Sequence, residues 1–292
     1  MEAGGSNSSF SDDLSFDSMM VAALAAAVAL VAPVPSFHHV VVVVFENHER
    51  SEIAGNSSAP TFAALARRGA TLTGYDAVSH PSLPNYLALV SGSTHGISDD
   101  CTSCVVSGPS LADTLAAAGR TWKTYAEGLP RPGFTGASAG NYAKKHDPFL
   151  YFRNVLARPS WLSRVVPFKQ FARDVAARHL PDFALVVPNL CNDMHDCSVA
   201  TGDAWLRRNV VPLLSSPAFA GGVVFVVFDE GQSDAGGGGN VEALALGPTV
   251  LPGSVSHEPT SHYGLLRTIE QAWGLPLLGR SARARPITGI WR

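Results

Sequence analysis

An uninterrupted apolar run, Val40–Phe45 (VVVVVF), constrains the fold more than any other stretch of this sequence. A half-exposed strand alternates apolar and polar residues, so a continuous β-branched run predicts a strand that is covered on both faces. Phe183–Val187 and Val223–Phe228 have the same character, and Val241–Leu246 is predicted as a fourth strand. Strands of this kind are typical of a mostly parallel sheet between layers of helices.

The segments between these strands have the length and spacing of helices. Three of the predicted helices end at a glycine, Gly69, Gly92 or Gly119, which would suit a left-handed C-terminal cap. Two glycine-rich stretches, 128–140 and 233–240, are predicted as loops. The expected fold class is α/β, a three-layer α/β/α sandwich. The predicted helices are 61–68, 85–91, 111–118, 168–179, 203–214 and 264–273.

The length of 292 residues suits one large domain, which we expect over residues 37–292. Charged residues make up only 15% of the chain, against about 25% in an average protein, and the net charge is −3. These values exclude a disordered chain, and they give no sign of a nucleic-acid partner.

Residues 1–36 are expected to lie outside the folded domain. The apolar run Met19–Ala32 is shorter than the roughly 20 residues that span a bilayer, so no stable membrane span is predicted. Its length fits the apolar part of a secretory signal, although no Lys or Arg precedes it. A cleaved export segment and a low-complexity tail both remain open, and the first is favoured.

The four cysteines form two close pairs, Cys101 with Cys104 and Cys191 with Cys197. A four-thiolate zinc site would need the second pair to be separated by two residues rather than five. Free thiols and two local disulfides are the other interpretations. We favour the disulfides, and with them an oxidising, extracytoplasmic location.

Acidic and histidine residues follow three of the predicted strands. Glu46-Asn47-His48 follows the first strand, Asn192–Asp196 (NDMHD) comes shortly after the second, and Asp229-Glu230 follows the third. The carboxyl ends of parallel strands meet at one edge of the sheet, where ligands bind. Crowded carboxylates repel one another, so a cation is the expected partner.

The segment Ser79–Asp100 carries a candidate nucleophile. Ser82 lies between two prolines and leads into the predicted 85–91 helix. The free N–H groups at a helix N-terminus bind phosphate readily. The alternative is that Ser82 only caps this helix.

Several motifs resemble those of one enzyme group. Ser82–Tyr86 (SLPNY), followed by Leu-Val-Ser-Gly and His-Gly-Ile, resembles the nucleophile segment of the alkaline phosphatase-like superfamily. Other motifs resemble the bacterial phosphoesterase family that includes acid phosphatases, phosphatidylinositol-3-phosphatases and phospholipase C-like enzymes. These motifs are Phe45–His48 (FENH), Tyr142–His146 (YAKKH), Asn192–Asp196, Phe228–Gly231 (FDEG) and Ser261–Glu270.

The resemblance implies a metal ion and a covalent mechanism. By matching position, the metal ligands would be Glu46, Asn47, Ser82, Asp229 and Glu230. Oxygen ligands suit Mg²⁺, Ca²⁺ or Mn²⁺ better than Zn²⁺. The Ser82 hydroxyl would attack phosphorus, and water would then hydrolyse the phosphoserine.

Asn85 is expected to donate to a phosphate oxygen. His195 and His262 could join Asp193 at a second metal site, or they could clamp the phosphate as protonated donors. Asp229-Glu230 stands where usual members have Asp-His, which favours one metal with histidine donors. Weaker phosphate-side candidates are His80, Lys145 and His146.

The function predicted from the sequence is therefore a metal-dependent phosphoric ester hydrolase, an acid phosphatase acting on a small-molecule or lipid phosphate ester. A phospholipase C-like phosphodiesterase and a catalytically inactive phosphate-binding module of the same fold remain as alternatives.

Overall fold

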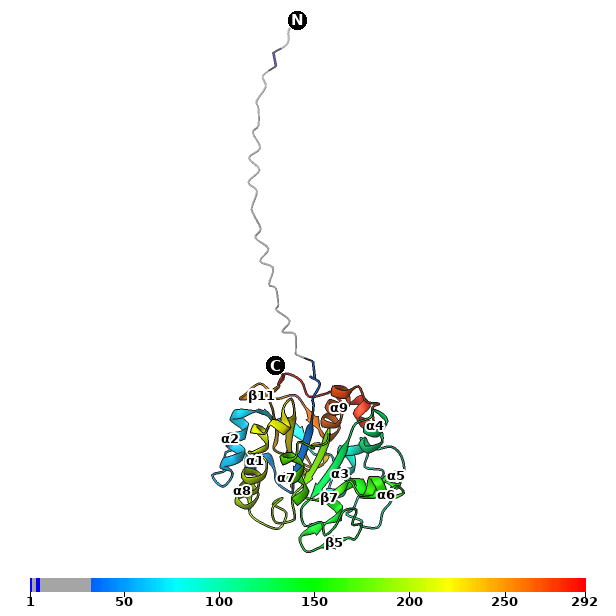
Figure 1. The fold of residues 1–292 in the computed structure, drawn as a ribbon. Coiled ribbons are helices and arrows are strands. Elements are labelled where there is room, and N and C mark those ends of the chain that lie inside the picture. Colours follow the sequence, from blue (N-terminus) through cyan, green and yellow to red (C-terminus); the bar gives the residue numbers. More distant parts are fainter. Residues whose placement is uncertain (2–3, 6–32) are drawn as a thin grey trace. The chain divides into compact units, whose positions relative to one another are not determined.

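The computed structural model describes residues 1, 4–5 and 33–292, and residues 33–292 contain all of its helices and strands (Figure 1). The predicted export segment, Met19–Ala32, lies outside the described residues. Within the described part of the chain, no helix combines the length and the apolar character that crossing a membrane requires.

Eight strands form the central sheet, in the order β11-β2-β10-β9-β1-β8-β4-β7. Strand β1 lies in the middle and runs parallel to both of its neighbours, β8 and β9. Only β10 runs antiparallel to its neighbours. This confirms the predicted mostly parallel sheet. The strands are β1 (Val40–Phe45), β2 (Ala70–Leu72), β4 (Trp122–Ala126), β7 (Val165–Pro167), β8 (Phe183–Val187), β9 (Val223–Phe228), β10 (Ala243–Leu246) and β11 (Ser254–Ser256).

Two short sheets lie outside the central one. Strand β3 (Tyr75–Asp76) pairs with β12 (Thr260–Ser261), and β5 (Ser138–Ala139) pairs with β6 (Tyr142–Ala143). The β3–β12 pair brings the start of the last helix close to the segment that precedes Ser82.

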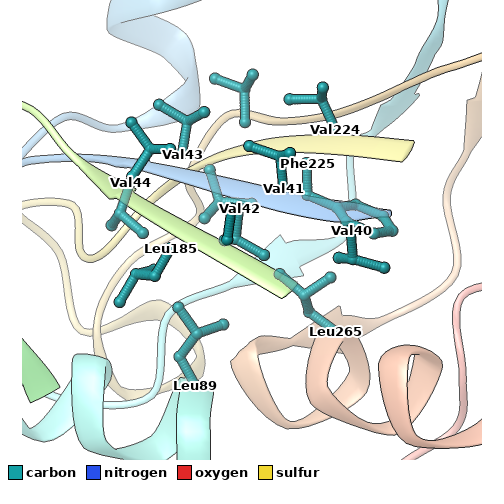
Figure 2. Close-up of a cluster of buried hydrophobic side chains, with 14 of the residues drawn as sticks. Val40, Val41, Val42, Val43, Val44, Leu89, Leu185, Val224, Phe225 and Leu265 are labelled. Atoms are coloured by element: carbon teal, nitrogen blue, oxygen red, sulfur yellow. The ribbon is translucent and has the colours of Figure 1, made fainter. Parts of the chain in front are cut away.

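The core forms on both faces of β1, every residue of which is buried. Figure 2 shows alternate valines of this strand pointing to opposite faces, with Leu89 and Leu265 approaching from one side. Burying one such side chain contributes about 1.5–3 kcal/mol relative to leaving it exposed. The continuous apolar runs therefore become the three central strands, where both faces are covered.

Nine α-helices occur in residues 33–292, and contacts group α3 with α9 and α2 with α8. Helix α2 begins after Ala59, which has no side chain that can cap it. Asp203 of α8 supplies the missing acceptor, with Oδ1 accepting from the backbone N–H of Thr61 at 2.7 Å and of Phe62 at 3.1 Å. The helices are α1 (Arg50–Ile53), α2 (Pro60–Arg68), α3 (Ser82–Ser91), α4 (Leu111–Ala117), α5 (Arg153–Leu156), α6 (Pro159–Leu162), α7 (Lys169–Ala176), α8 (Val199–Asn209) and α9 (His262–Trp273).

Several boundaries differ from the prediction. Helix α3 begins at Ser82 rather than Asn85, because Pro84 falls in the first turn, where no N–H partner is needed. Helix α9 begins at His262 rather than Gly264. The helix predicted over 203–214 is α8, which ends at Asn209, and the helix predicted over 168–179 is the shorter α7.

The predicted left-handed glycine caps are confirmed at two of the three helix ends. Gly92 and Gly119 have φ of 68° and 71°, as a left-handed C-terminus requires. Gly69 has φ of −126°, so the predicted left-handed cap is wrong there. A Cβ at Gly69 would instead collide with the backbone carbonyl oxygen of Ala245 on β10. This glycine allows close packing rather than an unusual backbone angle.

Both cysteine pairs form disulfides, Cys101–Cys104 and Cys191–Cys197, as favoured from their spacing. No thiolate remains for a four-cysteine zinc site within the described residues. The second disulfide closes the loop that carries Asp193 and His195.

Candidate active site

Three acidic residues meet where the central strands end. Glu46 directly follows β1, Asp229 directly follows β9, and Asp193 lies in the loop after β8. The backbone N–H of Glu46 donates to the Asp193 carbonyl at 2.9 Å, and that of Asp229 donates to the Phe45 carbonyl at 2.9 Å. These bonds extend the pairing past the strand ends and hold the three acids side by side. All three are buried.

Ser82 points at the first of these acids. It is the first residue of α3, is 1% exposed, and donates from Oγ to Glu46 Oε2 at 3.0 Å. The next N–H of the helix, from Leu83, donates to Asp100 Oδ1 at 3.0 Å. The helix N-terminus therefore holds the candidate nucleophile against a carboxylate that can accept its proton.

The Asp229-Glu230 pair lies next to Glu46, since the Asp229 N–H bonds to the residue before it. Asp229 Oδ1 accepts from the backbone N–H of Glu230 at 2.6 Å and from that of Asn47 at 3.3 Å. Asn47 adopts φ of 60°, a left-handed conformation that asparagine tolerates well. Glu230 Oε2 lies 2.9 Å from Nδ1 of His80. The predicted residues Glu46, Asn47, Ser82, Asp229 and Glu230 thus lie together.

Asn85 has both ends of its amide occupied. Oδ1 accepts from the backbone N–H of Val78 at 3.0 Å and of Ser79 at 3.1 Å. Nδ2 donates to the Ser79 carbonyl at 2.8 Å and lies 3.4 Å from Glu230 Oε2. The side chain predicted to bind phosphate holds the loop before Ser82 in this structure.

His195 lies half-exposed at the edge of the site. Its backbone N–H donates to Asp193 Oδ1 at 2.8 Å, and its Nδ1 lies 2.7 Å from Asp196 Oδ1. Its Nε2 lies 3.3 Å from Nζ of Lys145, which also donates to Asp100 Oδ2 at 2.8 Å. His195 and Lys145 are therefore placed where an incoming anion would meet them.

His262 is buried, and both of its ring nitrogens are occupied. Nε2 lies 2.6 Å from the backbone carbonyl of Asp229, and Nδ1 lies 2.9 Å from the Tyr75 hydroxyl. Because a carbonyl only accepts, Nε2 carries the proton and Nδ1 accepts from the tyrosine. Burial lowers the pKa of His262 to about 4, which disfavours the protonated form expected of a phosphate clamp. This arrangement leaves no ring nitrogen for a cation beside Asp193 and His195.

Tyr86 and His146 also contact Glu46. The sequence predicted no role for Tyr86 and only a weak one for His146. Tyr86 donates its hydroxyl to Glu46 Oε1 at 2.5 Å. His146, considered only as a phosphate-side residue, lies with Nε2 3.3 Å from the same oxygen and Nδ1 3.4 Å from Asp193 Oδ2. For Tyr86 the available signal was its position four residues after Ser82, on the same helix face.

The buried acids carry shifted pKa values. Burial raises the pKa of Glu46 well above its ordinary value, and the nearby carboxylates Asp229 and Asp193 raise it further. Burial, followed by Glu230, likewise raises the pKa of Asp229, and burial raises that of Asp193 to about 7. Without a positive partner, these groups therefore resist ionising together.

The residues present fit a divalent cation. Within the part of the chain that the structure describes, Asp229 Oδ2 and Asp193 Oδ2 are buried and accept no hydrogen bond. Ligand atoms of Glu46, His146 and His195 all lie within 4.8 Å of one another. Carboxylate oxygens beside imidazole nitrogens suit Mn²⁺ or Zn²⁺, and the oxygens alone suit Mg²⁺.

Comparisons with known sequences found clear matches. Residues 56–276 match the family model described as Phosphoesterase family. A phosphatidylinositol-3-phosphatase of Mycobacterium tuberculosis is 42% identical over 260 residues, which cover 88% of this chain and 84% of that one. A probable acid phosphatase of Kluyveromyces lactis is 34% identical over 257 residues, which cover 84% of this chain and 60% of that one.

Solved structures support the fold. A protein of the alkaline phosphatase superfamily from Vibrio parahaemolyticus aligns with a TM-score of 0.56 at 14% identity. The alignment covers 86% of this chain and 71% of that chain. The architecture is therefore alkaline phosphatase-like, as the motifs implied.

Proposed function

The chain belongs to the Phosphoesterase family and is a hydrolase of phosphoric esters, and from this premise we propose that it is a metal-dependent acid phosphatase that acts through a phosphoserine at Ser82. The observation that carries the proposal is the 3.0 Å contact between the Ser82 hydroxyl and the buried Glu46 carboxylate. A serine hydroxyl needs such an acceptor, or a metal ion, before it can act as a nucleophile.

The proposed reaction has two displacements at phosphorus. In the first, the bond from Ser82 Oγ to phosphorus forms while the bond from phosphorus to the leaving oxygen breaks. The serine proton passes to Glu46, and His195 at the edge of the site donates a proton to the leaving oxygen. In the second, water attacks the phosphoserine and gives a proton to the now neutral His195, the bond from phosphorus to Ser82 Oγ breaks, and the proton held by Glu46 returns to Ser82 as phosphate leaves.

The proposed cation ligands are Glu46, Ser82, Asp229 and Glu230, with Asn47 beside them. When bound there, a divalent cation would lower the pKa of the serine hydroxyl and neutralise charge on the phosphoryl group. Asp193, His146 and His195 lie next to this set and are the candidates for any second ion.

Lys145, His195 and His80 favour a phosphate monoester over a diester. They are basic side chains near the acid cluster, and a monoester carries more negative charge than a diester. A lipid inositol monophosphate is the first natural substrate to assay, because the relative from M. tuberculosis is named for such an activity.

The experiment is an assay of p-nitrophenyl phosphate and bis-p-nitrophenyl phosphate from acidic to alkaline pH, with Mg²⁺, Mn²⁺, Ca²⁺, Zn²⁺ or EDTA. We expect the monoester to be hydrolysed at acidic pH with a metal ion and not with EDTA. A preference for the diester would support the phospholipase C-like alternative. No turnover under any condition would support the inactive binding module.

Replacing the nucleophile tests the covalent step. Ser82→Ala should lower kcat by about 10³-fold or more and abolish labelling by radioactive substrate after an acid quench. Ser91→Ala is the matched control, because Ser91 lies buried on the same helix and donates to the Leu87 carbonyl. Full activity of Ser82→Ala would remove the assignment.

We also infer an extracytoplasmic location. Both disulfides join cysteines that are close in sequence, and such bonds persist in oxidising compartments. Detecting the protein with both bonds intact in the culture supernatant or cell envelope would support this location.

A further inference from the structure

Tyr86 has no role in the proposed reaction, yet its hydroxyl lies against the carboxylate on which that reaction depends. The residue is 1% exposed and donates to Glu46 Oε1 at 2.5 Å. Ser82 donates to the other oxygen, Oε2. Each oxygen of the carboxylate therefore has its own hydroxyl donor, and the rotation of Glu46 is fixed.

The spacing on α3 explains how one helix supplies both donors. Ser82 and Tyr86 are four residues apart, so their side chains lie on the same face, one turn from each other. The long tyrosine reaches Oε1 from the second turn, while the short serine reaches Oε2 from the first. Moving either residue by one position would turn its hydroxyl away from Glu46.

His146 supports Tyr86 from the opposite side. Their rings stack, with centroids 5.2 Å apart and planes inclined by 11°. His146 is 1% exposed, and its two nitrogens lie near Glu46 Oε1 and Asp193 Oδ2. His146 thus lies between two site carboxylates, and burial keeps both rings of the stacked pair away from solvent.

We propose that Tyr86 and His146 are positioning residues that hold the Glu46 carboxylate with Oε2 directed at Ser82 and the cation site. Neither residue needs to contact substrate for this role. The inference rests on the proposed function, since it concerns the metal affinity and nucleophile activation of the same site. Outer residues that orient metal ligands commonly change metal affinity or activity by about 10- to 100-fold.

The test removes one oxygen atom. Tyr86→Phe retains the ring and its stacking on His146 but deletes the donor to Glu46. We expect Mn²⁺ binding, measured by isothermal titration calorimetry without substrate, to weaken by about 10- to 100-fold. At limiting Mn²⁺, kcat should fall with KM nearly unchanged, and excess Mn²⁺ should restore part of the loss.

Tyr125→Phe is the matched control. Tyr125 is also buried, and its hydroxyl donates to a different carboxylate, Asp174 Oδ2, at 2.7 Å. It should affect stability without changing Mn²⁺ affinity. Wild-type Mn²⁺ affinity in Tyr86→Phe, or an equal loss in Tyr125→Phe, would overturn the positioning role. If Tyr86→Phe does not fold, Tyr86→Met, whose flexible side chain fills the space without a hydroxyl, is titrated in its place.

The two proposals can fail separately. If the wild-type protein binds no Mn²⁺ and hydrolyses no phosphate ester, the proposed function fails before any variant is compared. If the wild-type protein is active and Tyr86→Phe matches it in affinity and kcat, only the positioning role fails.

Discussion

At the scale of single residues, Asn85, one turn after the proposed nucleophile Ser82, makes its hydrogen bonds mainly to the backbone. Its amide makes hydrogen bonds with the backbone of Val78 and Ser79, so the path of the chain into Ser82 depends on it. Asn85→Ala would leave two partly buried N–H groups, those of Val78 and Ser79, without their acceptor. An unsatisfied buried group costs about 1–3 kcal/mol.

We therefore predict that Asn85→Ala lowers the free energy of unfolding by about 1–3 kcal/mol, measured by urea denaturation, in addition to lowering kcat. Asn209→Ala is the control, because Asn209 is half-exposed and its Nδ2 donates to one carbonyl, that of Trp205. If Asn85 acts only as a phosphate donor, the variant will have wild-type stability and a lower kcat/KM.

The site residues differ in how well the sequence could predict them. Glu46 and Asp229 follow long apolar strands directly, so their meeting at one edge follows from the sheet itself. His262 lies in a matching motif, but its orientation depends on a bond to the backbone of Asp229 and on Tyr75. Contacts of this kind depend on packing between distant segments and leave no local pattern.

At the scale of elements, Glu270 on α9 ties the helix to the turn that follows it. Its oxygens accept from the backbone N–H of Leu278 at 2.8 Å and from the Ser281 hydroxyl at 2.6 Å. Burial raises the pKa of Glu270 from 4.5 to about 7, and the two hydrogen bonds only partly oppose this. The folded protein therefore retains a proton there that the unfolded chain releases at lower pH.

The sign of the resulting pH dependence follows from linkage. Between about pH 4.5 and 7 the folded state binds more protons at Glu270 than the unfolded state, so its contribution to stability is complete below this range and is lost as the pH rises through it. We predict that Glu270→Gln makes the decline in urea-denaturation free energy across this range shallower by the share of one proton, because Asp193 and the other buried acids with raised pKa values also contribute. The exposed Glu258→Gln should retain it, and an unchanged slope in Glu270→Gln would contradict the assignment.

The sequence predicted the long strands of the central sheet better than the short ones. The three five- or six-residue apolar strands, β1, β8 and β9, were predicted with their observed bounds. Strands β2, β7 and β11 have three residues each, too few to show a period, and β4 includes Lys123 and Thr124 within its run. These strands form because they pair with neighbouring strands of the sheet. That pairing joins segments distant in sequence, so it cannot be read from the strand's own residues.

At the scale of the whole molecule, binding of the proposed cation at the buried carboxylates would add to the stability of the fold. A ligand that binds only the folded state stabilises it by about 2.7 kcal/mol at a concentration 100 times its Kd. For a protein near this size, 1 kcal/mol corresponds to roughly 2–4 °C in Tm. We predict that saturating Mn²⁺ raises Tm and that EDTA returns it to the value of the metal-free protein.

The control for this prediction is Asp229→Asn, which removes one carboxylate charge from the site. Its Tm should respond much less to Mn²⁺, as followed by differential scanning calorimetry. A Tm of the wild-type protein that is the same with Mn²⁺ and with EDTA would show that no cation binds to the folded state at these acids.

The bond between the Asp229 N–H and the Phe45 carbonyl, just past the paired strands, has a consequence for how the enzyme reaches its working state. Because Glu46 and Asp229 lie on adjoining backbones at the ends of the buried central strands, neither can move away without breaking hydrogen bonds to its neighbour. Folding sets this arrangement of the acids once, so no free energy is spent on rearranging them in each turnover. Any gating of catalysis must therefore come from the surrounding loops.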